Sequence, residues 1–308
     1  MDTKRNKVLH YKRVIFAEEN FETTFEALVT DAFTQLKTIG QRTVTYNGEK
    51  KIKCLKYKKI KNGGMFVHLS TYVEGELAST VANTPHVEES DLDTTQAPAG
   101  SDFVDGDIHA LIFENNILFC LSTARDTTIK NYFDLIFEKI NTDVCNYTIK
   151  PPISKQIISM LDSGIKTICL DSLATPLEIK KLIKSKSHIL KPLRTIAELI
   201  FSREKNLEEI QGLDGLMFGL HVNSKGRIDV DSQSQIVMQS MGKEIIEEDL
   251  GGFYIITRDG SKITANSITH KHKIRLDKFG KTVFRNETWS ALSVFREKLE
   301  EQRIITRK

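Results

Sequence analysis

Residues 108–121 read IHALIFENNILFCL, two apolar runs separated by the short polar sequence Glu114-Asn115-Asn116. Runs of this length that are rich in Ile, Leu and Phe predict buried strands. Asn115 and Asn116 both tolerate the left-handed backbone that a tight hairpin turn requires. The stretch therefore predicts an antiparallel hairpin in the core of the protein.

Further hairpins and amphipathic helices are predicted around this one. Strands over 43–46, 50–60 and 65–72, and a second hairpin over 253–257 and 262–265, carry turn residues between them. Asn20 is a predicted helix cap, and apolar residues at helical spacing follow it up to Gly40. Similar spacing predicts helices over 128–140 and after Asn286. The fold class is therefore α+β, with antiparallel sheets and hairpins packed against amphipathic helices.

A chain of 308 residues is long enough for two cores. Pro151-Pro152 is a natural break, which predicts an N-terminal α+β domain over 1–150 and a C-terminal α+β domain over 151–308. Within the first, residues 81–106 are rich in Thr, Ser, Pro, Asp and Glu, and this composition predicts an exposed acidic loop.

The sequence indicates a cytoplasmic protein that does not insert into a membrane. The longest apolar stretch is interrupted by Glu114, Asn115 and Asn116, and so is shorter than the roughly 18 uninterrupted residues that a spanning helix needs. The apolar run after the basic N-terminus is too short for a signal peptide. The cysteines are widely spaced within apolar runs, which favours reduced core thiols.

Charge is distributed unevenly along the chain although the net charge is only +3. Residues 42–61 contain eight basic residues and a single acid, Glu49, whereas residues 74–107 contain nine acids and no Lys or Arg. Further basic stretches lie within 180–194 and 271–285. Lysines arranged in this way can replace counterions along a phosphate backbone and bind nucleic acid without reading its sequence.

Two interpretations of the densest basic segment remain open. With regular strand alternation, Lys51 and Lys53, with Lys59 and Lys61, face one side, while Lys50, Lys56 and Lys58 face the other. Such lysines either contact phosphate groups or protect an exposed edge strand from aggregation. Three separate basic clusters favour binding, and the scarcity of arginine favours backbone contact over base recognition. The predicted DNA-binding residues are Arg42, Lys50, Lys51, Lys53, Lys56, Lys58, Lys59, Lys61, Lys180, Lys181, Lys184, Lys186, Lys271, Lys273 and Arg275.

The acidic segment also has two interpretations. It is either a solvated loop or a mimic of phosphate that covers the basic surface when no nucleic acid is bound. The second interpretation is the hypothesis of autoinhibition, and removal of residues 87–100 tests it.

Signatures of enzymes are absent from the sequence. It contains neither a phosphate-binding loop nor a dinucleotide-binding turn, and no nucleophile elbow, so no cofactor and no catalytic residue is predicted. His270 and His272 would share one face of a strand, but the neighbouring lysines disfavour a metal there. Asp31, Glu49 and Lys51 imitate the spacing of metal-dependent nucleases, although Asp31 is predicted to lie on a helix. No metal site is therefore predicted, and a nuclease remains an alternative.

The order of elements resembles that of the phage-exclusion RexA family. The resemblance rests on the strands 109–113 and 117–121, Thr123-Ala124-Arg125-Asp126-Thr127-Thr128 and the helix 131–139, and on Asp259-Gly260-Ser261-Lys262-Ile263 with the helix after Lys281. It covers the layout of most of the chain and includes no invariant motif. It implies a homodimer that binds double-stranded DNA without strong sequence preference and signals phage infection to a separate effector protein. The DNA-binding component of the Kiwa defence system is a second analogue.

These features together predict a non-enzymatic DNA-binding protein, a sensor or regulator in antiphage defence and abortive infection. The alternatives are a metal-dependent nuclease and a scaffold whose charged segments contact only proteins.

Overall fold

A computed structural model describes residues 3–18, 21–46, 48–61, 63–82, 89–142, 146–170, 188–191, 193–195, 220–223, 232–247 and 252–305. The chain divides into two compact units. Unit 1 comprises Met1–Ile149 together with Lys271–Lys308, and unit 2 comprises Lys150–His270. The mixture of helices and antiparallel strands confirms the predicted α+β class.

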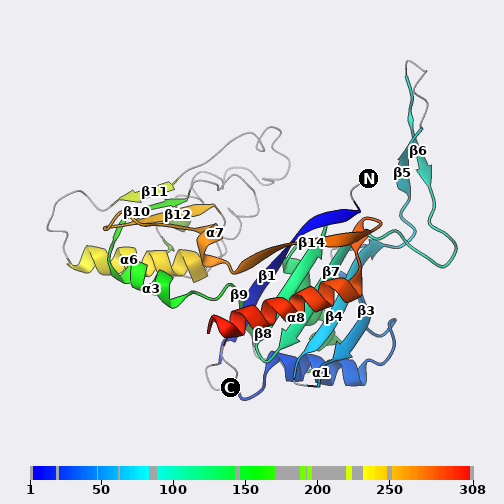
Figure 1. Cartoon of the computed structure of the whole chain (residues 1–308), viewed down its shortest axis with the longest axis horizontal. Coiled ribbons are helices and arrows are strands. Elements are labelled where there is room, and N and C mark those ends of the chain that lie inside the picture. Colours follow the sequence, from blue (N-terminus) through cyan, green and yellow to red (C-terminus); the bar gives the residue numbers. More distant parts are fainter. Residues whose placement is uncertain are drawn as a thin grey trace. The chain divides into compact units, whose positions relative to one another are not determined.

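The main feature of unit 1 is a nine-stranded sheet with the strand order β15-β14-β1-β8-β7-β4-β3-β2, to which β9 is added by pairing with β1 (Figure 1). Neighbouring strands are antiparallel wherever their register is resolved. The strands are β1 (Lys4–Phe16), β2 (Thr43–Tyr46), β3 (Lys50–Lys59), β4 (Met65–Val73), β7 (Gly106–Phe113), β8 (Asn116–Ser122), β9 (Tyr147–Lys150), β14 (Lys271–Phe279) and β15 (Thr282–Val283).

The hairpin predicted from residues 108–121 forms the middle of this sheet. Every residue of β7 is buried, because its side chains face a hydrophobic core on each side. The turn lies one residue earlier than predicted: Phe113 pairs with Asn116, and Glu114 has the left-handed backbone with φ of 48°. Asn115 instead accepts a hydrogen bond from the backbone N–H of Phe25 at 2.8 Å. The turn is thereby fixed to the first helix.

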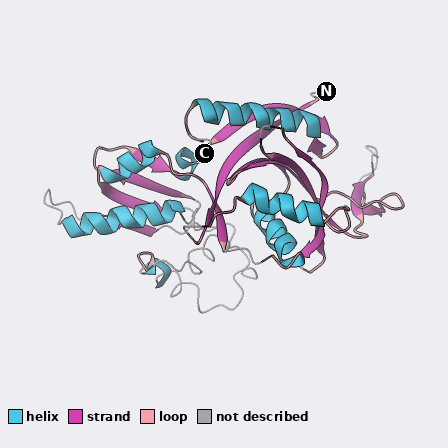
Figure 2. Ribbon diagram, turned by 90° about the horizontal axis from the view of Figure 1, so that it is seen from below, coloured by secondary structure: helices cyan, strands magenta, loops and turns pink. Residues whose placement is uncertain are grey.

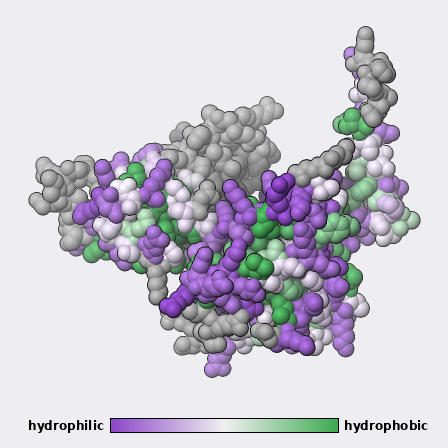
Figure 3. All heavy atoms as spheres, in the orientation of Figure 1, coloured by the Kyte–Doolittle hydropathy of each residue, from purple (hydrophilic) through white to green (hydrophobic). Residues whose placement is uncertain are grey.

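Helices cover both faces of the sheet. Helices α1 (Phe25–Gln35) and α2 (Thr127–Lys139) lie inside the curve of the sheet, and α8 (Arg285–Glu301) lies on its other side (Figure 2). Side chains alternate along β7, so Ile108, Ala110 and Ile112 pack with α1 and α2, whereas Leu111 and Phe113 pack with α8. The outward side of α8 is mainly hydrophilic (Figure 3).

Helix α1 begins later than the sequence predicts. Asn20 lies outside the described residues, and Thr24 is the N-cap, with its side-chain oxygen accepting a hydrogen bond from the backbone N–H of Ala27. Phe21 precedes the helix and packs against Phe16, with the two ring centroids 4.5 Å apart. The apolar spacing of Phe21 therefore reflects packing of the incoming chain and not helix periodicity.

The end of the chain belongs to unit 1, which corrects the predicted domain 151–308. The sequence break near Pro151 is close to the real boundary, but β14 returns to pair with β1 over seven residues, from Lys4 opposite Asp277 to His10 opposite Lys271. Strand β1 itself was not predicted. Unit 2 is therefore an insertion between β9 and β14.

Unit 2 contains a four-stranded sheet in the order β11-β10-β12-β13. Ile168, Ile255 and Ile263 of this sheet are fully buried, in one core with Leu161 of α3 and Ile245 of α6. The predicted hairpin of 253–257 and 262–265 is present as β12 and β13. The elements are α3 (Lys155–Asp162), β10 (Ile165–Leu170), β11 (Leu220–Asn223), α6 (Ser232–Glu247), β12 (Phe253–Thr257), β13 (Lys262–Thr264) and α7 (Ala265–Ile268).

The acidic segment between β4 and β7 contains a two-stranded hairpin, β5 (Ala78–Val81) and β6 (Leu92–Thr95). All residues of both strands are exposed except Ala78, which is half-buried. The described part of the segment therefore has no core of its own, as its composition predicts. None of the described helices is long and apolar enough to span a membrane.

Replacement of Phe133 by alanine is expected to lower the free energy of unfolding by about 3–5 kcal/mol, because its fully buried ring packs edge-on against Phe25 and also contacts Phe33 and Phe137. Urea unfolding measures the loss. Ile39→Ala is the control, since Ile39 is exposed and its loss is expected to change stability by less than about 0.5 kcal/mol. Equal losses in the two variants would contradict the assigned core.

A candidate nucleic-acid interface on the large sheet

Strand β3 carries the densest group of lysines, and a bulge determines the side on which they lie. Cys54 pairs with Leu69 of β4, yet Lys56 pairs with the next residue, His68, so Leu55 is the extra residue. The bulge reverses the alternation beyond it. Lys51, Lys53, Lys56 and Lys58 consequently share the face that α8 covers in part, as their partners on β4 show: Tyr72, Ser70, His68 and Phe66.

This arrangement corrects the faces predicted from regular alternation. Lys59 pairs with Met65 and so faces α1 and α2, and Lys61 follows the end of the strand. Lys50 pairs with Val73 and also lies opposite to the four lysines. A bulge cannot be identified from a local pattern of Lys and apolar residues, because it depends on the pairing with β4. We call Lys51, Lys53, Lys56 and Lys58 the lysine face.

The lysine face differs in exposure along its length. Lys56 and Lys58 are exposed, whereas Lys51 and Lys53 are half-buried. The ammonium group of Lys53 lies 3.7 Å from the ring centroid of Tyr72, a cation–π contact, and Lys51 forms an ion pair with Glu74. The exposed lysines are thus available to a ligand, and the half-buried ones are held in place by neighbours.

The two ends of the acidic segment contact this strand. The hydrogen bond that Lys51 donates to Glu74 raises the pKa of Lys51, and the one that Lys50 donates to Asp105 raises the pKa of Lys50. Both lysines therefore remain fully charged at neutral pH. Acids near the start and end of the segment neutralise part of the basic strand in this structure.

Beside the lysine face lies a buried polar cluster. His68 of β4 pairs directly with His109 of β7, and Asp107 lies two residues before His109 on the same face. Nε2 of His68 is 2.5 Å from Oδ1 of Asp107, and Nε2 of His109 is 3.0 Å from Oδ2. The two imidazole rings are stacked with their centroids 4.2 Å apart.

The charges in this cluster follow from burial and contact. Burial by itself would raise the pKa of Asp107, but its contacts with His109 and His68 outweigh this effect and lower the pKa to about 2. Burial lowers the pKa of His109, although the contact with Asp107 acts in the opposite direction. At neutral pH the cluster therefore contains an ionised carboxylate and a neutral His109.

Cationic side chains surround the cluster. Lys56 is the cross-strand neighbour of His68, and Lys53 is the neighbour of Ser70, which in turn pairs with Asp107. From β1, the ammonium group of Lys7 donates hydrogen bonds to Oγ of Ser122 at 2.6 Å and to the carbonyl of Leu121 at 3.0 Å. The polar part of this sheet face is thus positively charged around one buried carboxylate.

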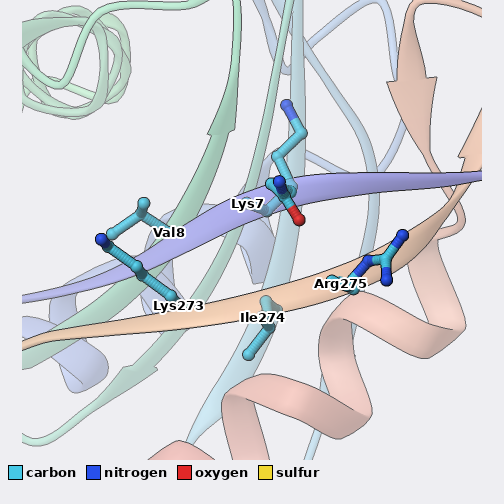
Figure 4. A pocket seen from close by; sticks show the side chains of 6 residues that line it. Lys7, Val8, Lys273, Ile274 and Arg275 are labelled. Atoms are coloured by element: carbon cyan, nitrogen blue, oxygen red, sulfur yellow. The ribbon is translucent and has the colours of Figure 1, made fainter.

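A second basic group lies at the other side of the sheet. Lys271, Lys273 and Arg275 pair with residues of β1. They face away from α8, since Ile274 and Leu276, which alternate with them, pack with α8. Lys273 and Arg275 line a shallow pocket with Asn6 and Val8 (Figure 4). Strands β1, β8, β7 and β4 separate this group from β3. The two predicted basic stretches therefore do not form one continuous surface.

The remaining predicted residues have different positions. Lys180, Lys181, Lys184 and Lys186 lie outside the described residues. Arg42 is buried: its guanidinium donates hydrogen bonds to the carbonyls of Leu36 and Lys37, both at 2.8 Å, and lies over the ring of Tyr57. Arg42 therefore stabilises the fold and is not part of an exposed phosphate-binding surface.

Replacement of Arg42 by alanine is expected to lower the free energy of unfolding by about 1–3 kcal/mol, because two carbonyls lose their donor. Arg42→Lys should restore only part of this loss, since an ammonium group lacks the planar guanidinium that lies over the rings of Phe33 and Tyr57. Urea unfolding measures both effects. A variant with normal stability but weakened DNA binding would contradict this assignment.

The nuclease pattern of the sequence is not assembled in the structure. The carboxylate of Asp31 accepts a hydrogen bond from Gln35 on the exposed side of α1, and α1 covers the face opposite to Lys51. His272 stacks on Phe295 of α8 and its Nε2 lies 3.2 Å from Nζ of Lys298. Within the described part of the chain, the only group of three residues arranged for a metal ion is His68, Asp107 and His109.

Sequence reasoning missed this cluster because His68 and Asp107 are 39 residues apart. The available signal was the alternation of Asp107 and His109 in an otherwise apolar strand, which places two polar side chains on one buried face. No model of a protein family, no curated protein and no solved structure matches this chain. The resemblance to the RexA family stays a prediction.

Proposed function

We propose that this protein binds double-stranded DNA through its phosphate backbone, without strong sequence preference, and acts as a sensor or regulator in antiphage defence. The observation that carries the DNA-binding proposal is the bulge at Leu55, which gathers Lys51, Lys53, Lys56 and Lys58 on one side of β3. Lysine ammonium groups spaced along a strand suit contacts with successive phosphates. A homodimer and a separate effector protein belong to the same proposal.

Edge protection is the competing explanation for these lysines. Strand β2 pairs only with Lys50 to Lys53, so Lys56 to Lys59 have no strand partner on that side among the described strands. Charges and bulges both protect such an edge from pairing with another chain. Protection of the edge strand, however, requires only that charged side chains lie near the edge, and it does not require them to share one face of the sheet. The two explanations therefore differ in their prediction for DNA affinity. A phosphate-binding face requires Lys56 and Lys58 more than Lys59 and Lys61, whereas edge protection makes no such distinction.

Replacement of both Lys56 and Lys58 by glutamine is expected to weaken binding to a fluorescent DNA duplex and to reduce the slope of log affinity against log salt by about 2, since two phosphate contacts are lost. Fluorescence anisotropy titrations at about 50 and about 200 mM KCl give the affinity at two salt concentrations, and their difference gives the slope.

The matched control is Lys59→Gln with Lys61→Gln, which makes the same change in charge on the same segment but outside the lysine face. Equal effects of the two double variants would exclude a face-specific contact. Wild-type protein that does not bind at the lower salt concentration would refute DNA binding, and cleavage of the duplex upon addition of magnesium would support the nuclease instead.

Partial autoinhibition by the acidic segment is tested at its two contacts with β3. Glu74→Gln with Asp105→Asn is expected to raise DNA affinity at low salt, because Lys51 and Lys50 lose their ion pairs. Asp91→Asn with Asp93→Asn removes the same charge at the exposed hairpin and serves as the control. If the control raises DNA affinity equally, the gain comes from net charge alone and the two ion pairs are not inhibitory. Deletion of residues 87–100 separately tests the hypothesis that the whole loop covers the basic surface.

A further inference from the structure

The cluster of His68, Asp107 and His109 contains the donor atoms of a metal site. Two imidazole nitrogens and one carboxylate oxygen form a ligand set that suits zinc and other divalent transition metals. The candidate ligand atoms all lie within 4.8 Å of one another. They come from two adjacent strands in the middle of the sheet, so the backbone hydrogen bonds of β4 and β7 fix their spacing.

The cluster also has buried polar atoms without a hydrogen-bond partner among the described residues. These are Nδ1 of His68 and both ring nitrogens of His109, the latter side chain being only 1% exposed. Nε2 of His109 is close to Asp107 at 3.0 Å, but the two groups are not aligned for a hydrogen bond. Buried polar atoms are normally paired, and their accumulation at three adjacent side chains indicates a ligand.

The donor set suits a divalent ion in its charge as well as in its spacing. Imidazole nitrogens and a carboxylate oxygen are ordinary ligands of such ions. The single carboxylate of Asp107 would offset one of the two positive charges.

Nearby cations determine what else the site can hold. Lys7 and Arg285 both act electrostatically on the cluster, Lys7 on Asp107 and Arg285 on His109. Their charges oppose a bare divalent cation and favour a site in which an anionic or water ligand completes the coordination. Three protein ligands leave such a position open.

We propose that His68, Asp107 and His109 bind one divalent transition-metal ion on the same side of the sheet as Lys51, Lys53, Lys56 and Lys58. Zinc is the probe used to test this site. The imidazole nitrogens of the two histidines and the carboxylate of Asp107 are the protein ligands. This site is independent of the DNA-binding proposal, because its ligands are not the lysines that would contact phosphate.

Metal content tests the proposal directly. Protein prepared without a histidine tag is loaded with zinc, dialysed against metal-free buffer and analysed by elemental mass spectrometry. Wild-type protein is expected to retain about one zinc per chain, and Asp107→Asn and His109→Gln to retain little. His10→Gln is the matched control, since His10 lies on the same sheet, stacks on Phe119 and is not in the cluster. Wild-type protein that retains no more zinc than the His109 variant would overturn the site.

A second readout keeps the test valid if a buried variant fails to fold. Wild-type protein is titrated with cobalt(II) and the visible absorption of the bound ion is recorded, with His68→Gln as the comparison because His68 is the least buried ligand. The absorption should be present in the wild type and in the His10 variant, and be lost in the His68 variant. An unchanged spectrum in the His68 variant would exclude the proposed ligand set. Neither measurement contains DNA, so its result is independent of DNA binding.

Discussion

Burial of β7 on both faces is the constraint on which the rest of unit 1 depends. A strand whose side chains all avoid water requires apolar cover on each side of the sheet. Helices α1 and α2 supply this cover on one face, and both lie within the first 139 residues. The other face needs α8, which comes from the end of the chain. The chain must therefore rejoin the same sheet after unit 2, so that α8 can cover this face.

Elements with local signals were predictable from the sequence, and elements defined by distant pairing were not. The central hairpin, α2 and the β12–β13 hairpin have apolar runs or periodicity of their own, and they are confirmed within a few residues. The start of α1 was wrong because Phe21 has the right spacing but packs before the helix. Strand β1 and the return of β14 depend on each other across 260 residues or more, and no local pattern indicates such a pair.

The candidate site shows the same division at the level of side chains. The number and density of lysines in β3 are visible in the sequence, but their common face depends on one extra residue, Leu55, opposite β4. Arg42 looked like a member of the same basic group, yet its Nη1 donates hydrogen bonds to two backbone carbonyls. His68 and His109 become neighbours only through the register of β4 and β7. Charge composition therefore indicated a class of ligand, and pairing decided which side chains can act together.

The insertion of unit 2 has a consequence for how this architecture can vary. Both strands that border the insertion, β9 and β14, are hydrogen-bonded to β1. The strand pairs on both sides of β1 and β8 thus form without any residue between Lys150 and His270. The strand pairing that positions the lysines and the buried histidines therefore does not constrain the sequence of unit 2, even though unit 2 separates β9 from β14 along the chain.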